Sequence, residues 1–125
     1  MLKPYEFVAA VAAVLCGIPV VAGSAGPDSL SRAGEIYKRD CLVCHGTNGD
    51  GRTGIAADRD LAMPDWTDPK SLAAKPDRQL FQIIRYGRGK MPSESVGRAD
   101  DDEVRDLIQY IRGMAKPVGP PKPAS

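Results

Sequence analysis

The pentapeptide Cys41-Leu42-Val43-Cys44-His45 places two thiols and one imidazole side by side. On a helix, residues three and four apart lie on one face, so these groups can meet a single planar partner. Cys41 and Cys44 can then reach the two vinyl groups of one porphyrin, while His45 brings a ring nitrogen beneath the iron. A C-x-x-C-H string is read as c-type haem attachment for this reason. The stretch predicts one covalently bound haem c, with His45 as a ligand of its iron.

Three other uses of these thiols compete with haem attachment. Zinc usually needs four ligands in two separated clusters, but the only other cysteine, Cys16, lies in an apolar N-terminal run and His45 is the only histidine. A thioredoxin-like dithiol belongs beside a βαβ pattern, and this chain has almost no strand-like alternation. A disulfide across so short a spacing would close a tight, strained ring. Haem attachment is favoured over all three.

Residues 1–25 have the layout of a secretory signal peptide. A single lysine precedes an almost unbroken apolar run from 8 to 21, and small residues offer a cleavage site after Ala25. The run is shorter than the ~20 residues of a spanning helix, and Glu6 limits its extension upstream. An uncleaved membrane anchor stays open as the alternative. Both interpretations predict an exported, periplasmic protein, with the membrane involved only if the segment is retained.

Length and charge restrict the rest of the chain to one small domain. The chain has 125 residues, so it holds a single domain at most, which is expected at residues 26–115. Lys and Arg total 17 against 16 for Asp and Glu, and nothing indicates the clustered basic face of a nucleic-acid-binding protein. So small a domain has a limited apolar core, and a large apolar cofactor would explain how it folds. Residues 116–125 are rich in proline and are predicted to form a flexible tail.

Four helices and no convincing strand are predicted, so the fold class is all-α, with about four helices wrapped around one covalent haem. Apolar residues recur at three- and four-residue steps toward the attachment motif, which predicts that the first helix leads straight into it. The acidic run that opens the last helix resembles a capping box and is expected to be a solvated surface. The predicted helices span about residues 28–44, 68–75, 76–86 and 100–113.

Glycines raise two further expectations. The glycine-rich stretch 46–54 lacks the Gly-Lys-Ser/Thr end of a phosphate-binding loop, and it is predicted to turn closely around the porphyrin edge. Gly34 lies on the apolar face of the first helix, where a glycine costs ~1 kcal/mol of helix propensity. It marks either a close backbone contact or an ordinary tolerated glycine, and both interpretations stay open.

With these elements in place, the chain resembles a class I c-type cytochrome of the short bacterial monohaem kind. The resemblance covers about residues 30–112. In that family a glycine and an aromatic residue of the first helix meet an aromatic residue of the last, and Gly34, Tyr37 and Tyr110 match these positions. The resemblance implies the cytochrome c fold around one haem c and its iron. The matching residues are Gly34, Tyr37, Cys41 to Gly46, Gly49 to Gly51, Leu80 to Ile84, Gly89 to Pro92 and Leu107 to Ile111.

The resemblance also implies that Met91 is the second axial ligand, because the family has a methionine shortly before the last helix, often followed by proline. Thioether ligation suits this chain, since no second histidine exists and Met/His ligation raises the haem potential. Met63, also followed by proline, is the rival. It lies only eighteen residues after His45, whereas Met91 follows a complete helix that can carry the chain to the opposite haem face. Met91 is favoured for that reason.

Three kinds of contact around the cofactor are expected. A ligating histidine normally donates its second N–H to a carbonyl or carboxylate, and family analogy assigns the acceptor to the carbonyl of Pro64 or a nearby residue. Trp66, the only tryptophan, is expected either to donate its indole N–H to a haem propionate or to form a buried aromatic wall. Arg52, Arg59 and Arg88 are candidates for pairing with the propionates.

These features predict a one-electron carrier of the periplasm, cycling between Fe(III) and Fe(II) with both axial sites filled. It would exchange electrons with donor and acceptor proteins, and it needs no substrate pocket, so no enzyme activity of its own is predicted. One alternative is a cytochrome c subunit of a membrane-bound or periplasmic oxidoreductase complex. Another is a five-coordinate haem protein that binds or senses a small gas, which requires a vacant distal site and conflicts with the match at Met91.

Overall fold

The computed structural model describes residues 25–116, and every regular element in this range is a helix. The all-α class is thereby confirmed. The predicted signal peptide or anchor at residues 1–25 lies outside the described residues except for Ala25, and the predicted tail at 116–125 lies outside them except for Lys116. The helices are α1 (Pro27–Asp40), α2 (Leu42–His45), α3 (Gly54–Asp58), α4 (Pro69–Ala73), α5 (Asp77–Tyr86) and α6 (Asp101–Arg112). No helix within residues 25–116 is long and apolar enough to span a membrane.

The helix count of about four was too low, for two local reasons. The predicted helix 28–44 is divided at Cys41, whose ψ of −36° is helical but whose φ of −118° is not, so that α1 ends there and α2 begins. The stretch 46–54 was predicted to be a loop throughout, but Gly54 is the first residue of the short helix α3. The Thr53 hydroxyl caps α3 by accepting a hydrogen bond from the backbone N–H of Ala56.

Helices α4 and α6 begin where their capping residues predict. The Asp68 side chain accepts from the Lys70 N–H at the start of α4, with proline in the first turn. The capping box at α6 is complete, because Asp100 accepts from the N–H of Glu103 and Glu103 accepts from the N–H of Asp100. These caps fix where the loops around the helices start.

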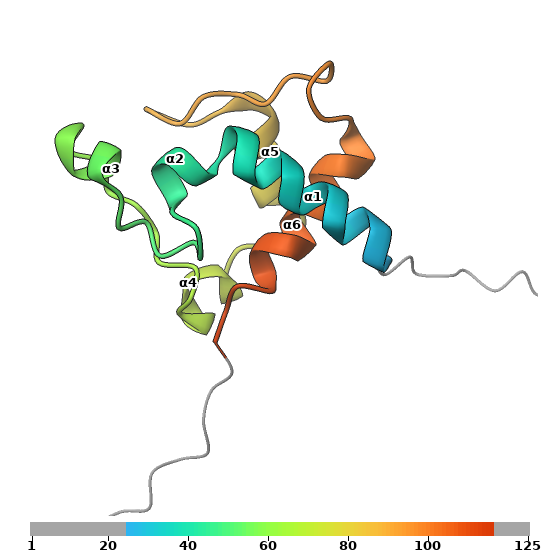
Figure 1. Ribbon diagram of the computed structural model, residues 1–125, viewed down its shortest axis with the longest axis horizontal. Coiled ribbons are helices and arrows are strands. Elements are labelled where there is room, and N and C mark those ends of the chain that lie inside the picture. Colours follow the sequence, from blue (N-terminus) through green and yellow to red (C-terminus); the bar gives the residue numbers. More distant parts are fainter. Residues whose placement is uncertain (1–24, 117–125) are drawn as a thin grey trace, which may run out of the picture.

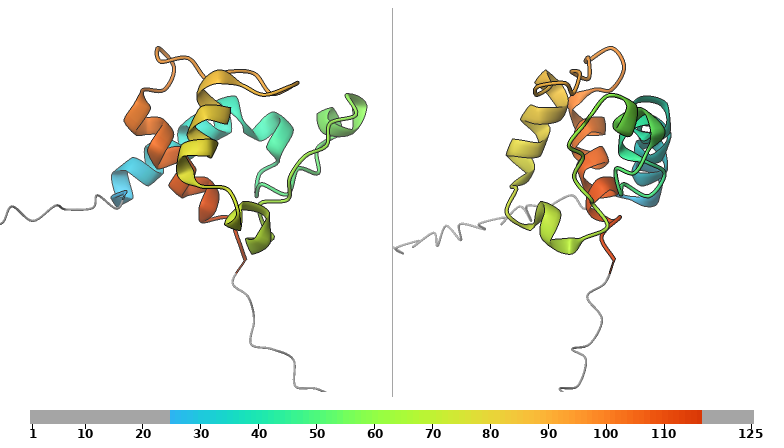
Figure 2. Two further views of the ribbon diagram at one scale, coloured as in Figure 1. Left: turned by 180° about the vertical axis from the view of Figure 1, so that it is seen from behind. Right: turned by 90° about the vertical axis from the view of Figure 1, so that its left-hand side faces the viewer.

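Helix α6 lies at the centre of the fold. It packs against α1 on one side and α5 on the other, and Figure 2 shows it between these two helices. Its apolar stripe is fully buried against α1, and the largest enclosed side chains are Ile36, Tyr37, Val104, Leu107 and Ile108.

Gly34 of α1 faces Tyr110 of α6, and Figure 1 shows that the two helices cross. A Cβ atom at this position would lie 3.2 Å from Cε2 of Tyr110, tighter than most Cβ contacts. The Tyr110 ring in turn lies 5.6 Å from that of Tyr37, measured between ring centroids. Of the two interpretations of Gly34, the structure favours the close contact, between the glycine of the first helix and the aromatic residue of the last.

Two long connections, one from α2 to α5 and one from α5 to α6, contain most of the residues outside the packed helices. The chain leaves α2, passes through α3 and returns by α4 to α5, as Figure 1 shows. After α5 a long irregular segment, residues 87–100, leads to the start of α6. The candidate site residues lie in two parts of the chain, from Cys41 to Trp66 and, after α5, from Arg88 to Met91.

Candidate functional site

The attachment motif lies at the junction of α1 and α2. The backbone N–H groups of Cys44 and His45 both donate to the carbonyl oxygen of Cys41, at 3.2 and 3.0 Å, which brings the three side chains together in one turn. Cys41 and Cys44 are half-buried free thiols, so neither is held in a disulfide. Burial, and next the nearby Glu94 carboxylate, raise the pKa of Cys41 to about 12. Burial therefore favours the neutral thiol at Cys41, and both cysteines are free to form thioethers with haem.

His45 is a buried neutral imidazole. It is 7% exposed, and burial lowers its pKa to about 4. Its Nδ1 atom is enclosed and has no hydrogen-bond partner among the described residues. A neutral imidazole is the form that binds metals, and no set of three His, Cys, Asp or Glu side chains within residues 25–116 could hold a metal ion unaided. This donor set fits an iron that arrives within a porphyrin and gives no ligand set for the zinc alternative.

Trp66 lies against the ring of His45. The two rings are stacked at 4.2 Å between centroids with an interplanar angle of 13°. The backbone N–H of Trp66 donates to the carbonyl of Gly49 at 2.8 Å, and a Cβ atom on Gly49 would lie 3.2 Å from the indole ring. Trp66 is thus a buried aromatic residue that packs flat against the ring of His45. Donation to a propionate stays a prediction. No pattern in the sequence indicates the stacking, which joins the end of α2 to the segment between α3 and α4.

The glycine-rich loop folds back on the attachment motif. Gly51 donates its backbone N–H to the carbonyl of His45 at 2.9 Å, and the hydroxyl of Tyr37 donates to the carbonyl of Gly46 at 2.6 Å. Gly46 and Gly51 have φ values of 85° and 71°, in the left-handed region that favours glycine. The loop therefore turns closely at the histidine, and its predicted path around the porphyrin edge stays a prediction.

Met63 and Pro64 pack against this same loop. A Cβ atom on Gly51 would lie 2.5 Å from Cβ of Met63 and 3.1 Å from the carbonyl oxygen of Pro64. Both residues are therefore neighbours of the loop that follows His45. The Pro64 carbonyl does not accept a hydrogen bond from Nδ1 of His45 here, since that nitrogen has no partner. The predicted acceptor is near the histidine loop but is not joined to the ring.

Met91 lies on a tight turn after α5. The backbone N–H of Arg88 donates to the carbonyl of Met91 at 3.0 Å, and the N–H of Met91 donates back at 2.9 Å. Gly89, with φ of 57°, occupies the first central position, as in a type II′ turn. Gly87 has φ of 76°, and a Cβ atom there would lie 2.7 Å from the Met91 carbonyl. The half-buried Met91 packs against the hydrophobic core, as does Cys41.

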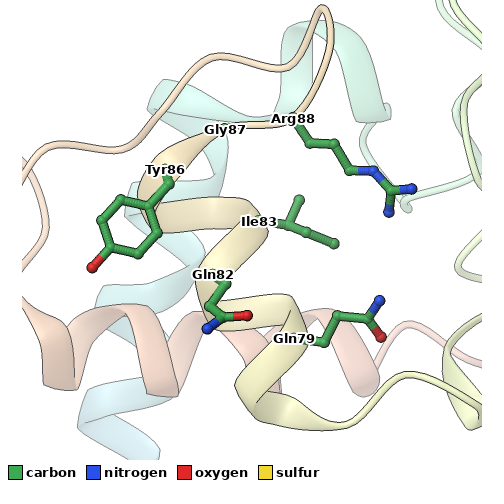
Figure 3. Close-up of a pocket in the computed structure, with 6 residues that line it drawn as sticks. All are labelled: Gln79, Gln82, Ile83, Tyr86, Gly87 and Arg88. Carbon is green, nitrogen blue, oxygen red and sulfur yellow. The ribbon is translucent and has the colours of Figure 1, made fainter.

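A groove of about 430 Å³ runs along α5 beside this turn and is drawn in Figure 3. Gln79, Ile83 and Arg88 point to one side of α5, and Tyr86 points away from them. Ile83 is half-buried, which gives that side an apolar floor. The groove is lined by Gln79, Gln82, Ile83, Tyr86, Gly87 and Arg88.

The three arginines predicted as propionate partners are placed differently. Arg88 lines the groove on α5. Arg52 is exposed and lies 3.7 Å from the carboxylate of Asp65. Arg59 is exposed at the end of α3, where its carbonyl accepts a hydrogen bond from Nζ of Lys90 at 3.0 Å. Arg88 alone of the three lines the groove beside the Met91 turn.

Two basic residues of the site region were missed in the sequence. Lys90 ties the Met91 turn to the end of α3, through the carbonyls of Arg59 and Asp60. Arg85 is buried on α5 although arginine is normally exposed. Neither interaction has a sequence signal, because each joins residues far apart in the chain.

Comparisons with known proteins agree with this arrangement. Residues 28–111 match the family model described as "Cytochrome C oxidase, cbb3-type, subunit III". The "Cytochrome bc1 complex cytochrome c subunit" of Corynebacterium efficiens is 26% identical over 98 residues, which are 78% of this chain and 30% of that protein. The chain thus spans less than a third of that relative's length. The solved structure of "KustC0563 c-type cytochrome" matches with a TM-score of 0.58 and 24% identity, over 67% of this chain and 98% of that one, and shows the shared fold.

The family match includes the attachment motif, the glycine-rich loop, the Met91 turn and nearly all of α6. Covalent haem c with its iron is therefore the cofactor of this domain, and Cys41, Cys44 and His45 carry the attachment motif. The matched residues make up most of the chain and nearly all of its described part. The chain belongs to the family of cytochrome c domains described as cytochrome c oxidase, cbb3-type, subunit III.

Proposed function

We propose that this domain carries single electrons, with His45 and Met91 as the two axial ligands of its haem iron. When bound, haem supplies the reversible Fe(III)/Fe(II) couple, and the chain supplies ligands, orientation and protection from water. The observation that carries the proposal is the separate anchoring of the two residues. His45 is fixed on α2, and Met91 is fixed on a turn beyond α5, while both Met91 and Cys41 pack against one core.

The position of Met63 supports Met91 as the ligand. Met63 lies against Gly51, in the loop that directly follows His45 and donates to its carbonyl. A ligand opposite His45 must approach the other face of the porphyrin, and a residue packed into the histidine's own loop is poorly placed for that. Met91 comes from a different segment, held by its own turn.

The surroundings of His45 keep its imidazole neutral and hold the plane of the ring. Burial disfavours the imidazolium form of His45, and the stacked indole of Trp66 restricts rotation of the ring. A neutral nitrogen donor opposite a thioether favours Fe(II), so we propose a raised potential relative to bis-histidine haem.

Optical spectra of the purified holoprotein in both oxidation states, with and without carbon monoxide, test this function. We expect low-spin haem in both states and poor binding of carbon monoxide, because both axial positions are filled. A high-spin protein that takes up carbon monoxide freely would contradict the electron carrier and favour the five-coordinate, gas-binding alternative.

A second candidate function is that of a subunit in a larger oxidoreductase complex. The names of the family and of the Corynebacterium efficiens relative both describe complex subunits. In either role we propose donor and acceptor proteins as the partners and no enzyme activity of the isolated domain. Purification from native membranes in mild detergent separates the two roles. Stable copurifying chains favour the subunit, and a monomeric soluble cytochrome favours the free carrier.

We further propose that the haem domain works in the periplasm, delivered by residues 1–25. This rests on the layout of that segment in the sequence. Intact-mass analysis of protein expressed with its own N-terminus decides between cleavage near Ala25 and a retained anchor. Haem-loaded protein found only in the cytoplasm would contradict the proposed location.

A further inference from the structure

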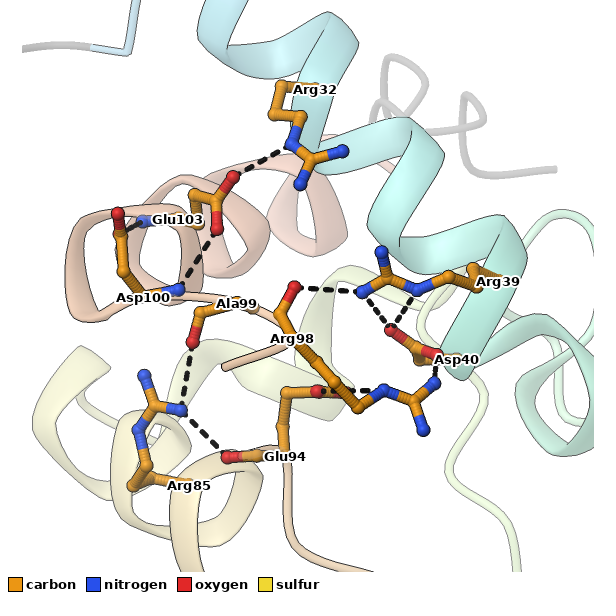
Figure 4. A network of polar contacts seen from close by, with 9 residues as sticks. All are labelled: Arg32, Arg39, Asp40, Arg85, Glu94, Arg98, Ala99, Asp100 and Glu103. Carbon is orange, nitrogen blue, oxygen red and sulfur yellow. Dashed lines mark hydrogen bonds and ion pairs between the residues drawn. The ribbon is translucent and has the colours of Figure 1, made fainter. Parts of the chain in front are cut away.

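An ionic cluster with two buried members joins the segment after Met91 to α1, the helix that leads into the haem-attachment motif. Figure 4 shows its members reaching from α1, α5 and the loop before α6. The side chain of Arg85 is 6% exposed and that of Asp40 is 4% exposed. Charges are almost never buried this deeply unless paired. We name Arg39, Asp40, Arg85 and Arg98 the arginine clamp.

Arg85 holds the segment after Met91 at two places. Its Nη1 atom donates to the carbonyl oxygens of Glu94 at 2.7 Å and Ala99 at 3.0 Å. Its Nη2 atom donates to the carboxylate of Asp101 at 2.7 Å, at the start of α6. The planar guanidinium presents several donors in a fixed fork, so one side chain can fix three acceptors together. A lysine in its place could not reproduce this geometry.

Asp40 forms the other half of the clamp, directly before Cys41 in the chain. Its carboxylate pairs with Nη2 of Arg39 at 2.5 Å and, through its other oxygen, with the guanidinium of Arg98. Arg39 also donates to the backbone carbonyl of Arg98 at 2.9 Å. The end of the Met91 segment is therefore tied to the residue that precedes the first haem-attaching cysteine.

These contacts shorten the part of the chain that can move with Met91. The backbone N–H of Glu94 also donates to the carbonyl of Ile84 at 2.8 Å, so the loop between α5 and Glu94 is closed at its base. Without the clamp, this single backbone hydrogen bond would be left to hold the segment that runs on to Ala99. A longer loop samples more conformations, and holding any one of them costs more entropy.

We propose that the arginine clamp is a positioning device that retains Met91 on the haem iron by holding residues 92–99 against α1 and α5. This inference rests on the proposed role of Met91 as axial ligand. None of the hydrogen bonds and ion pairs of the clamp involves His45 or Met91. The clamp acts by limiting how far the Met91 segment can swing away, so its effect is on release of the thioether and not on the iron chemistry.

The test is the rate at which imidazole replaces the sixth ligand in the ferric holoprotein. At saturating imidazole this rate becomes limited by departure of the protein ligand. We expect Arg98→Ala and Arg85→Lys each to raise the limiting rate by about tenfold, the factor that corresponds to 1.4 kcal/mol. Arg98 is 57% exposed, so its truncation keeps the test available if the buried Arg85 variant does not fold.

Arg32→Ala is the matched control. Arg32 also pairs with an acid across α1 and α6, donating to Glu103 at 2.7 Å, but among the described residues no hydrogen bond or ion pair joins its side chain to residues 92–99. We expect its limiting rate to stay within twofold of wild type.

The outcomes separate the two proposals. Clamp variants with an unchanged limiting rate overturn the clamp and leave the electron carrier in place. An equal acceleration in Arg32→Ala overturns it too, because general loosening would explain the result. A wild-type protein that is already high-spin overturns the ligand assignment and the clamp together.

Discussion

The two sides of the site are held by different kinds of contact. On the His45 side, the backbone is held by neighbours in sequence, namely the α2 turn, Gly46 and Gly51, and Trp66 adds a stacking contact from farther along the chain. On the Met91 side, the local turn is short, and the wider segment depends on residues from distant helices, among them Arg85 and Asp40. The first side is fixed by local backbone geometry, and the second by long-range polar contacts.

If His45 and Met91 are the two axial ligands, as we propose, the two are unequally easy to displace. His45 directly follows Cys44, so the covalent attachment of both cysteines would keep it at the haem unless the α2 turn unfolds. Met91 can leave when its segment swings out, because no covalent bond holds it and its anchors are hydrogen bonds. We expect the methionine side to be the one at which ligand exchange starts.

The largest expected effect is the loss of covalent haem attachment when both thiols are removed. In Cys41→Ala combined with Cys44→Ala, no thioether can form, so we expect either no holoprotein or haem that is fully extracted by acid and organic solvent. Haem staining of the denatured polypeptide measures this directly. Unchanged covalent staining in the double variant would contradict the assignment of these cysteines.

Removing the sulphur on the other side should open the site without losing the haem. Met91→Ala should bind carbon monoxide rapidly in the ferrous state. It should also lower the midpoint potential by on the order of 0.1 V, a fraction of the roughly 0.8 V over which axial ligands set haem potentials. Carbon monoxide kinetics and redox titration measure the two effects.

Met63→Ala is the matched control, because it removes the other methionine that precedes a proline. It should leave spectrum and potential as in wild type and affect only packing near Gly51. If Met63→Ala removes the low-spin signature while Met91→Ala keeps it, Met63 is the axial ligand and Met91 is not.

The difference between local and long-range contacts also explains which features the sequence could predict. The attachment motif, the all-α class and the caps at Asp68 and Asp100 depend on residues close together in the chain, and their positions agree with the prediction. The break at Cys41 and the short helix α3 were missed, since short helices give too few residues for a period to be seen. The stacking of Trp66 and the burial of Arg85 were missed because they join distant residues, for which one sequence carries no signal.

The support shared by both sides is the crossing of α1 and α6, and Gly34→Leu tests it. A side chain there must push against the Tyr110 ring, because a Cβ atom alone would lie 3.2 Å from it. We expect the holoprotein to lose ~1–3 kcal/mol of stability through overpacking, measured by chemical or thermal unfolding. Gly54→Leu, at a position with open space around it, should change stability by less than about 0.5 kcal/mol. Equal unfolding free energies for the two variants would mean that the close contact at Gly34 does not limit the stability of the protein.

The smallest expected effect is confined to the His45 side. Tyr37→Phe removes the hydroxyl that donates to the Gly46 carbonyl at 2.6 Å but keeps the ring that packs against Trp66 and Tyr110. Burial raises the pKa of Tyr37, so the hydroxyl stays protonated and able to donate. The carbonyl follows His45 directly and is buried, so we expect a loss of about 1 kcal/mol in the free energy of unfolding.

The exposed residue Tyr86, on the outer side of α5, provides the control, and Tyr86→Phe should melt like wild type. The decisive measurement is the imidazole-limited rate of ligand release in Tyr37→Phe. If the two sides are held independently, this rate stays at the wild-type value although the protein is less stable, because Tyr37 contacts the histidine loop and not the arginine clamp. A faster release would mean that the histidine side also controls Met91, and the division between local and long-range anchoring would fail.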